Sequence, residues 1–147
     1  MNERILKHLT TLAIQNPGVQ GRYKIAAGLV YKKIVIASGI NQYKTHPIMA
    51  NGCYKEDQIF LHAEADAIRN SLRLITLDQL AKCEMYIVRV KRPDIHSREW
   101  VHALAKPCPG CSKLMAQFNI KRVSYTLDPD IGAQRYLVLA NKVVDIL

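Results

Sequence analysis

The sequence predicts one α/β domain over residues 1–147, built as a mixed β-sheet with helices on its faces. A chain of 147 residues has room for a single domain. Hydrophobic residues make up 49% of it and charged residues 22%, which is typical of a globular protein with a packed core and excludes a disordered or coiled-coil chain. Apolar residues follow helical and strand-like spacings in the order α-β-β-α-β-α-β-β.

The first three elements are a helix and a hairpin. Residues 3–15 are expected to be helical because their apolar residues fall on one stripe, and an Asn-Pro-Gly sequence ends the helix. Two short apolar runs, at 23–30 and 33–38, are separated by the turn-like Tyr31-Lys32. This pattern predicts an antiparallel β-hairpin.

A long irregular connection, residues 39–61, follows the hairpin, and connections of this length are often functional. A helix is predicted over residues 62–74 and a strand over 84–90. A second long connection, rich in Lys and Arg, occupies residues 91–106. The buried face of the helix is expected to comprise Ile68, Leu72 and Ile75.

The last elements are a helix over 108–118 and strands over 121–127 and 134–140, with 141–147 as a tail. Only about seven residues separate the two strands, whereas a parallel crossover needs a dozen or more. We therefore expect these strands to pair antiparallel.

The formal net charge is +9, from 21 basic and 12 acidic residues. Such a surface favours anionic partners such as nucleotides or nucleic acid, although a basic surface can also serve solubility alone. No apolar run approaches the roughly 18–20 residues of a membrane span, and the charged N-terminal segment shows no secretory signal. The sequence therefore predicts a soluble, cytoplasmic protein without a membrane partner.

Two close cysteines suggest a metal site, because four cysteines without a signal peptide are too few for a disulfide scaffold. Cys108 and Cys111 lie three residues apart at the start of a predicted helix, so both sulfurs share one face. Pro107 helps to set the start of the helix, and the exposed N–H groups and positive end of the helix dipole favour thiolates there. With His62 they would form a Zn²⁺ site with an open fourth position, the arrangement of catalytic zinc.

Glu64 lies two residues after His62, close enough to exchange protons with a water on the metal without binding the metal itself. Taken alone, His-x-Glu carries little information, and Cys-x-x-Cys also occurs in redox motifs and structural zinc sites. Both halves together, each at a predicted helix start, are far more specific. Cys83, before a strand, is expected to be a buried thiol, and Cys53 with His46 is a candidate second metal site without an evident fourth ligand.

Through the motifs HAEADAI at 62–68 and PCPGCSKLMAQFNIKRVSY at 107–125, the chain resembles the zinc-dependent cytidine and deoxycytidylate deaminases. The resemblance extends from the hairpin near residue 23 to the strand that ends near residue 127. It implies a three-layer α/β/α sandwich and, in the family, a tendency to form homo-oligomers.

The resemblance also implies the roles of the motif residues. Zinc would be held by His62, Cys108 and Cys111. Glu64 would protonate N3 of cytosine and take a proton from the zinc-bound water, whose hydroxide attacks C4. Glu64 would then pass a proton to the departing ammonia.

Further residues are candidates for binding the substrate, and they are Asn41, Lys44, His46, Ala63 and Arg92. Asn41 matches a position at which family members bind substrate, often at the sugar, although a turn asparagine after glycine is also common. Arg92 belongs to a basic segment with Arg89, Lys91 and Arg98 that suits a 5′-phosphate. A solvated loop explains these charges, and those at Lys44 and His46, equally well.

The core motif and the charge favour deamination of dCMP to dUMP and ammonia. The short connection before the last strand instead resembles that of free cytidine or deoxycytidine deaminases. A tRNA or single-strand deaminase is a further alternative, in which the +9 surface would bind a nucleic-acid backbone. A non-catalytic zinc module would not need Glu64.

Overall fold

The computed structural model describes residues 2–17, 19, 23–52, 60–94, 96–128 and 136–141. In chain order its elements are α1 (Glu3–Ile14), β1 (Tyr23–Tyr31), β2 (Ile34–Ile40), the 3-10 helix η1 (Pro47–Gly52), α2 (Ala63–Ser71), α3 (Leu77–Leu80), β3 (Glu84–Lys91), β4 (Val101–Ala103), α4 (Pro109–Gln117), β5 (Arg122–Thr126) and β6 (Tyr136–Asn141). No helix in this described part is long and apolar enough to cross a bilayer.

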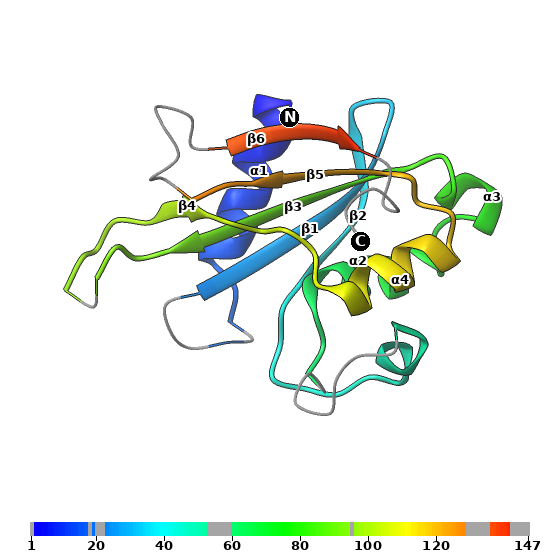
Figure 1. Cartoon of the computed structure of the whole chain (residues 1–147), viewed down its shortest axis with the longest axis horizontal. Coiled ribbons are helices and arrows are strands. Elements are labelled where there is room, and N and C mark those ends of the chain that lie inside the picture. The colour runs from blue at the N-terminus through cyan, green and yellow to red at the C-terminus, as the bar shows by residue number, and fades with distance from the viewer. Residues whose placement is uncertain are drawn as a thin grey trace.

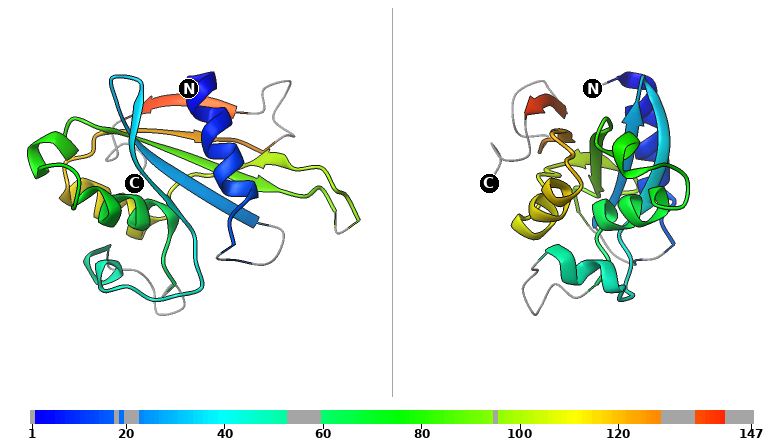
Figure 2. Two further views of the ribbon diagram at one scale, coloured as in Figure 1. Left: turned by 180° about the vertical axis from the view of Figure 1, so that it is seen from behind. Right: turned by 90° about the vertical axis from the view of Figure 1, so that its right-hand side faces the viewer.

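The strands form a mixed sheet in the order β2-β1-β3-β5-β6, with β4 paired to β3. Helix α1 covers one face, and α2 and α4 cover the other (Figures 1 and 2). Separate hydrophobic clusters fill the two spaces between the layers. The predicted three-layer α/β/α sandwich is therefore confirmed.

Helix α1 packs on the sheet through its apolar stripe, as its spacing predicted. Ile5 and Leu9 are buried in one cluster with Val88 of β3. The side chain of Asn2 caps the helix by accepting hydrogen bonds from the backbone N–H groups of Arg4 and Ile5.

Strands β1 and β2 form the predicted antiparallel hairpin, but its turn lies at Lys32 and Lys33 rather than at Tyr31-Lys32. Both lysines adopt left-handed backbone conformations, with φ of 49° and 64°. Two-residue hairpin turns of this kind match the right-handed twist of the strands. Tyr31 therefore stays in the strand and pairs with Ile34.

The sheet combines both kinds of strand pairing. Strand β1 pairs antiparallel with β3, and β3 pairs parallel with β5. The crossover between this parallel pair contains α4, which returns along the face that α2 also covers (Figure 1). Strand β6 pairs antiparallel with β5, which confirms the prediction from the short connection. The predicted tail at 141–147 lies, beyond Asn141, outside the described residues.

Helix α2 is shorter than predicted, since it ends at Ser71. Ile68 is buried and Ile75 packs against the core, as expected. Leu72 was wrongly assigned to the buried face and is 43% exposed, because it lies beyond the last helical turn.

Both long connections and the segment after α2 contain structure that the sequence analysis missed. Helix α3 begins with a capping box between Thr76 and Gln79, a signal that the sequence does contain. Strand β4 pairs antiparallel with the last residues of β3, with Val101 opposite Lys91. The three-residue strand β4 and the six-residue 3-10 helix η1 show too little periodicity to be recognised from the sequence.

Helix α2 lies so close to β2 that no side chain fits at Gly39. A Cβ atom at this position would overlap the backbone nitrogen of Ala67 and lie 2.5 Å from the carbonyl oxygen of Ala63. Because both atoms belong to the helix backbone, they cannot move aside as a side chain would. Gly39 therefore sets the distance between α2 and the sheet.

Replacing this glycine should separate helix from sheet. We expect Gly39→Ala to lower the free energy of unfolding by about 3 kcal/mol or more. Gly28→Ala is the matched control in β1, because its Cβ would lie 3.1 Å from a movable Leu9 side-chain atom. Urea denaturation followed by circular dichroism measures both, and equal losses would contradict the close approach at Gly39.

Candidate active site

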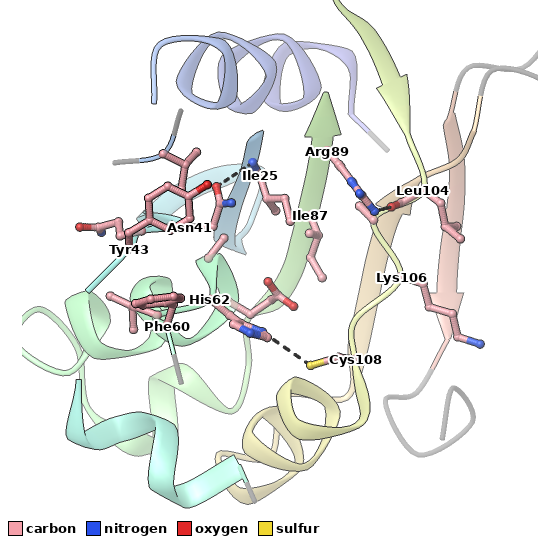
Figure 3. A pocket seen from close by; sticks show the side chains of 16 residues that line it. Ile25, Asn41, Tyr43, Phe60, His62, Ile87, Arg89, Leu104, Lys106 and Cys108 are labelled. Atoms are coloured by element: carbon pink, nitrogen blue, oxygen red, sulfur yellow. Dashed lines mark hydrogen bonds between the residues drawn. The ribbon is translucent and has the colours of Figure 1, made fainter. Parts of the chain in front are cut away.

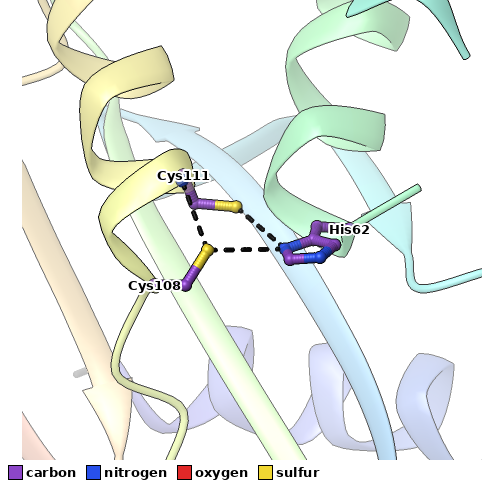
Figure 4. Close-up of side chains that lie close together, drawn as sticks. All are labelled: His62, Cys108 and Cys111. Carbon is purple, nitrogen blue, oxygen red and sulfur yellow. Dashed lines mark hydrogen bonds between the residues drawn. The ribbon is translucent and has the colours of Figure 1, made fainter. Parts of the chain in front are cut away.

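Three metal-binding side chains converge where the N-termini of α2 and α4 meet (Figure 4). His62 is the N-cap residue of α2, and Cys108 is the N-cap residue of α4. Cys111 lies in the first turn of α4, and Pro109 occupies one of its first positions, where a missing N–H is harmless. The sequence signals for two helix starts thus bring the three predicted ligands together.

The geometry of this group fits zinc. Nδ1 of His62 lies 3.6 Å from Sγ of Cys108 and 3.4 Å from Sγ of Cys111, and all three donor atoms lie within 4.8 Å of one another. Tetrahedral zinc, with bonds of about 2.0 Å to nitrogen and 2.3 Å to sulfur, spaces these atoms about 3.5 Å apart. Among the described residues this is the one cluster of three or more potential ligands.

Electrostatics favour the thiolate form of Cys108. Hydrogen bonding with Cys111 lowers the pKa of the Cys108 thiol to about 4, with a further contribution from His62 and against the opposing effect of burial. Burial lowers the pKa of His62, but the hydrogen bond with Cys108 and the charge of Glu64 together raise it above its ordinary value. Thiolate is the form that binds metal.

Glu64 lies in the first turn of α2 and is only 5% exposed. Burial raises the pKa of its carboxyl group, although the nearby His62 opposes this shift. A buried carboxyl group with a raised pKa is a candidate for holding and releasing a proton.

A cavity of about 400 Å³ lies beside these residues (Figure 3). It is lined by Val19, Ile25, Asn41, Gln42, Tyr43, Phe60, Leu61, His62, Ala63, Glu64, Ile87, Arg89, Leu104, Ala105, Lys106 and Cys108. Figure 3 shows His62 and Cys108 on one side of it, with Asn41 and Arg89 toward the opposite side. A molecule in this cavity could therefore contact both the metal-binding group and side chains of the sheet.

The structure brings two of the predicted substrate-binding residues to this cavity. Ala63 is buried between His62 and Glu64. Oδ1 of Asn41 accepts hydrogen bonds from the backbone N–H of Ile25, at 2.9 Å, and from the side chain of Asn16, at 2.8 Å. These contacts fix the orientation of the Asn41 amide.

The other three predicted substrate-binding residues do not line this cavity. Lys44 is exposed, and its carbonyl oxygen accepts a hydrogen bond from Leu61 N–H. His46 lines a separate pocket, and its Nδ1 accepts a hydrogen bond from the backbone N–H of Ile48. Arg92 is exposed and lies 4.8 Å from the centre of the Trp100 ring.

Several lining residues were not assigned to the site from the sequence. Tyr43 and Phe60 form an edge-to-face pair at 5.7 Å on one wall, and no local pattern marks them. Arg89 belongs to the basic segment that the sequence suggested for a 5′-phosphate, and it lies in β3, within the strand predicted over 84–90. Lys106 precedes the Pro-Cys motif and is exposed.

Asp66 is a further residue that the sequence analysis missed. Its buried carboxylate accepts hydrogen bonds from the backbone N–H of Ile40, at 3.0 Å, and from the side chain of Gln42, at 3.1 Å, and it pairs with Arg69 at 2.6 Å. It thereby ties the end of β2 to the helix that carries Glu64. The second acid of the HAEAD motif was the available signal.

The sequence contains two further cysteines, Cys53 and Cys83. Cys83 is a buried free thiol directly before β3, as predicted. Cys53, the partner suggested for His46 in a second metal site, lies outside the described residues.

Comparisons with known proteins agree with this geometry. The family model of the cytidine and deoxycytidylate deaminase zinc-binding region matches residues 2–127. The crystal structure of dCMP deaminase from the cyanophage S-TIM5, in complex with dCMP and dUMP, aligns with a TM-score of 0.57 at 21% identity and covers 99% of this chain and 88% of that one. A cytidine deaminase from Burkholderia pseudomallei aligns with a TM-score of 0.61 at 15% identity, covering 100% and 96%. No curated protein sequence matches this chain.

The two structural likenesses show a common fold. The family match spans most of the chain and includes the His62–Glu64 and Cys108–Cys111 segments. The chain therefore belongs to the cytidine and deoxycytidylate deaminase family and is a zinc-dependent deaminase.

Proposed function

We propose that the protein deaminates a cytosine nucleotide, converting dCMP to dUMP and ammonia, in the cavity beside His62. The observation that carries this proposal is the position of the buried Glu64 carboxyl next to the His62–Cys108–Cys111 group in one cavity. The cyanophage protein of similar fold is a dCMP deaminase with dCMP and dUMP bound, which supports the choice of a nucleotide.

In this proposal His62, Cys108 and Cys111 hold the zinc ion. When bound, zinc supplies a water that is activated as a nucleophile near neutral pH. The N-termini of α2 and α4 stabilise the negative charge of the thiolates, and the backbone N–H of Cys111 donates to Sγ of Cys108 at 3.4 Å. Since the described residues provide three ligands, a tetrahedral zinc ion bound to them would have a fourth position open to water.

Glu64 is the proposed proton carrier. Its carboxylate takes a proton from the attacking water and delivers it to N3 of cytosine while the water oxygen bonds to C4. It then takes the second proton from the hydroxyl group at C4 and supplies it to the amino group as the C4=O bond forms and the C4–N4 bond breaks, so that ammonia leaves. The raised pKa of the buried carboxyl group favours its holding the proton between these steps.

Asn41 is the proposed contact to the sugar or the base. Its Oδ1 accepts hydrogen bonds from Ile25 and Asn16. The Nδ2 group of Asn41 is the donor that we propose for the substrate. Ala63 is proposed to contribute through its small size. A methyl group at this position of the cavity lining leaves space for the substrate beside the metal-binding group.

Deamination of free cytidine or deoxycytidine is the second candidate. The antiparallel pairing of β5 and β6 favours it, because this topology resembles that of nucleoside deaminases. The similar fold of the Burkholderia cytidine deaminase supports it as well.

We further propose a cytoplasmic homo-oligomer. Leu72, Leu74 and Leu77 follow one another after α2 and are 43%, 64% and 63% exposed, although leucine side chains are usually buried. A second copy of the chain would remove these side chains from water.

Replacing the proton carrier should abolish turnover but leave the metal. We expect Glu64→Gln to lower kcat for dCMP by at least about 10³-fold and to retain zinc, because the amide cannot exchange the proton. Ammonia release from dCMP, deoxycytidine, cytidine, adenosine and a cytosine-containing oligonucleotide measures this, with Glu64→Gln as the blank. Turnover of nucleosides alone would favour the second candidate, and activity only on the oligonucleotide would favour a nucleic-acid substrate.

Removing a ligand should release zinc and destabilise the fold. We expect Cys111→Ser to lose most bound zinc on dialysis and to melt at a lower temperature, because metal binding is coupled to folding. Cys83→Ser is the matched control, since Cys83 is a buried thiol outside the metal-binding group. Metal analysis by mass spectrometry would contradict the assignment if both variants kept equal zinc.

The oligomer should depend on the exposed leucines. We expect light scattering to give a mass that is a multiple of the 16.7 kDa chain, and the double variant Leu74→Lys, Leu77→Lys to shift it toward the monomer. Ile34→Lys, at a similarly exposed position in β2, should leave the mass unchanged. A monomeric wild-type protein would contradict this proposal.

A further inference from the structure

We propose that Arg89 of β3 binds the 5′-phosphate of the substrate and so determines the preference for a nucleotide over a nucleoside. This inference rests on the proposed function and names a specificity-determining residue for it. It replaces Arg92, the residue that the sequence suggested for this role, by a neighbour on the same basic segment.

The strand places Arg89 at a suitable distance from the reaction centre. Ile87 and Arg89 both line the cavity, because alternate residues of a strand point to the same face. Ile87 packs in the cluster that contains Ala63 and Cys111. Arg89 lies one strand repeat, about 7 Å, beyond Ile87 along the cavity. In a nucleotide the sugar separates the phosphate from the base, so a phosphate-binding residue is expected at some distance from the metal-binding group.

Contacts with the protein hold the guanidinium in place. It lies 4.3 Å from the centre of the Tyr23 ring, and Nη1 donates to the carbonyl oxygen of Leu104 at 3.2 Å (Figure 3). Stacking on an aromatic ring and one hydrogen bond orient the planar group without neutralising it. A side chain ordered in advance loses little entropy when it binds an anion.

The charge of Arg89 remains available to a ligand. In the described part of the chain the ion pairs involve Arg69, Lys91 and Arg122, and none involves Arg89. Its Nε is buried and has no hydrogen-bond partner among these residues.

The cavity lining is complementary to a phosphate. His62, Glu64 and the Cys108 thiolate lie at the metal-binding group, and the other charged lining residues are the two cations Arg89 and Lys106. A phosphate accepts hydrogen bonds from a guanidinium through two oxygens, so Arg89 suits this group better than a lysine would. Arg92, in contrast, lies over Trp100 outside the lining.

Steady-state kinetics with dCMP and deoxycytidine test the assignment. Arg89→Met keeps the length of the stem and removes the charge. We expect kcat/KM for dCMP to fall about 10- to 100-fold, mainly through KM, and kcat/KM for deoxycytidine to stay within about twofold. Arg89→Lys should recover part of the loss, because it restores the charge without the fork.

Arg122→Met is the charge-matched control, since Arg122 is exposed on β5, pairs with Glu84 and does not line the cavity. Zinc content and melting temperature show that each variant is folded. An equal loss for dCMP and deoxycytidine in Arg89→Met, or a selective loss for dCMP in Arg92→Met instead, would overturn the inference.

A binding measurement separates this inference from the proposed function. Calorimetry should show that wild-type protein binds dUMP more tightly than deoxyuridine and that Arg89→Met abolishes the difference. If no cytosine compound releases ammonia but this difference is found, the proposed function fails and the phosphate site stands. If ammonia is released and the wild-type protein does not distinguish dUMP from deoxyuridine, the phosphate site fails alone.

Discussion

The structure depends on the meeting of two helix N-termini, those of α2 and α4. His62 and Cys108 are the N-cap residues of these helices, and Cys111 follows Cys108 in the first turn of α4. Two thiols and an imidazole within 4.8 Å of one another need a positive environment to exist as metal ligands, and two helix N-termini provide it. The sheet positions the two helices relative to each other. Helix α2 packs closely against β2 at Gly39, and α4 lies in the crossover between β3 and β5.

The same junction contains buried acids, which ordinarily reduce stability. Asp66 is compensated, since its carboxylate accepts backbone and side-chain hydrogen bonds and pairs with Arg69. Glu64 is buried, it takes part in none of the ion pairs between described residues, and burial raises the pKa of its carboxyl group. Two acids two residues apart thus differ in environment: Asp66 connects the helix to the sheet, and Glu64 lies beside the metal-binding group, where burial raises its pKa.

Three of the basic residues behind the net charge of +9 lie against aromatic rings of the structure. Arg89 and Arg92 lie over the rings of Tyr23 and Trp100, and Lys24 also lies near Trp100. An aromatic ring can hold a cation in position without neutralising it, whereas a carboxylate would neutralise it. Arg89 lines the cavity and Arg92 does not, so the position of each residue along β3 and beyond its end decides which guanidinium lies at the cavity.

The sequence by itself determined the elements and the metal-binding group, because these depend on local signals. Apolar spacing predicts α1 and β3, the short connection predicts the antiparallel β6, and the His-Ala-Glu and Pro-Cys-x-x-Cys motifs at helix starts predict the ligands. Only the tertiary structure decided which side chains share the cavity. Tyr43, Phe60 and Arg89 meet there from separate elements, while Lys44, His46 and Arg92 do not. Which residues meet depends on strand pairing and helix packing between distant segments, and no local pattern records that arrangement.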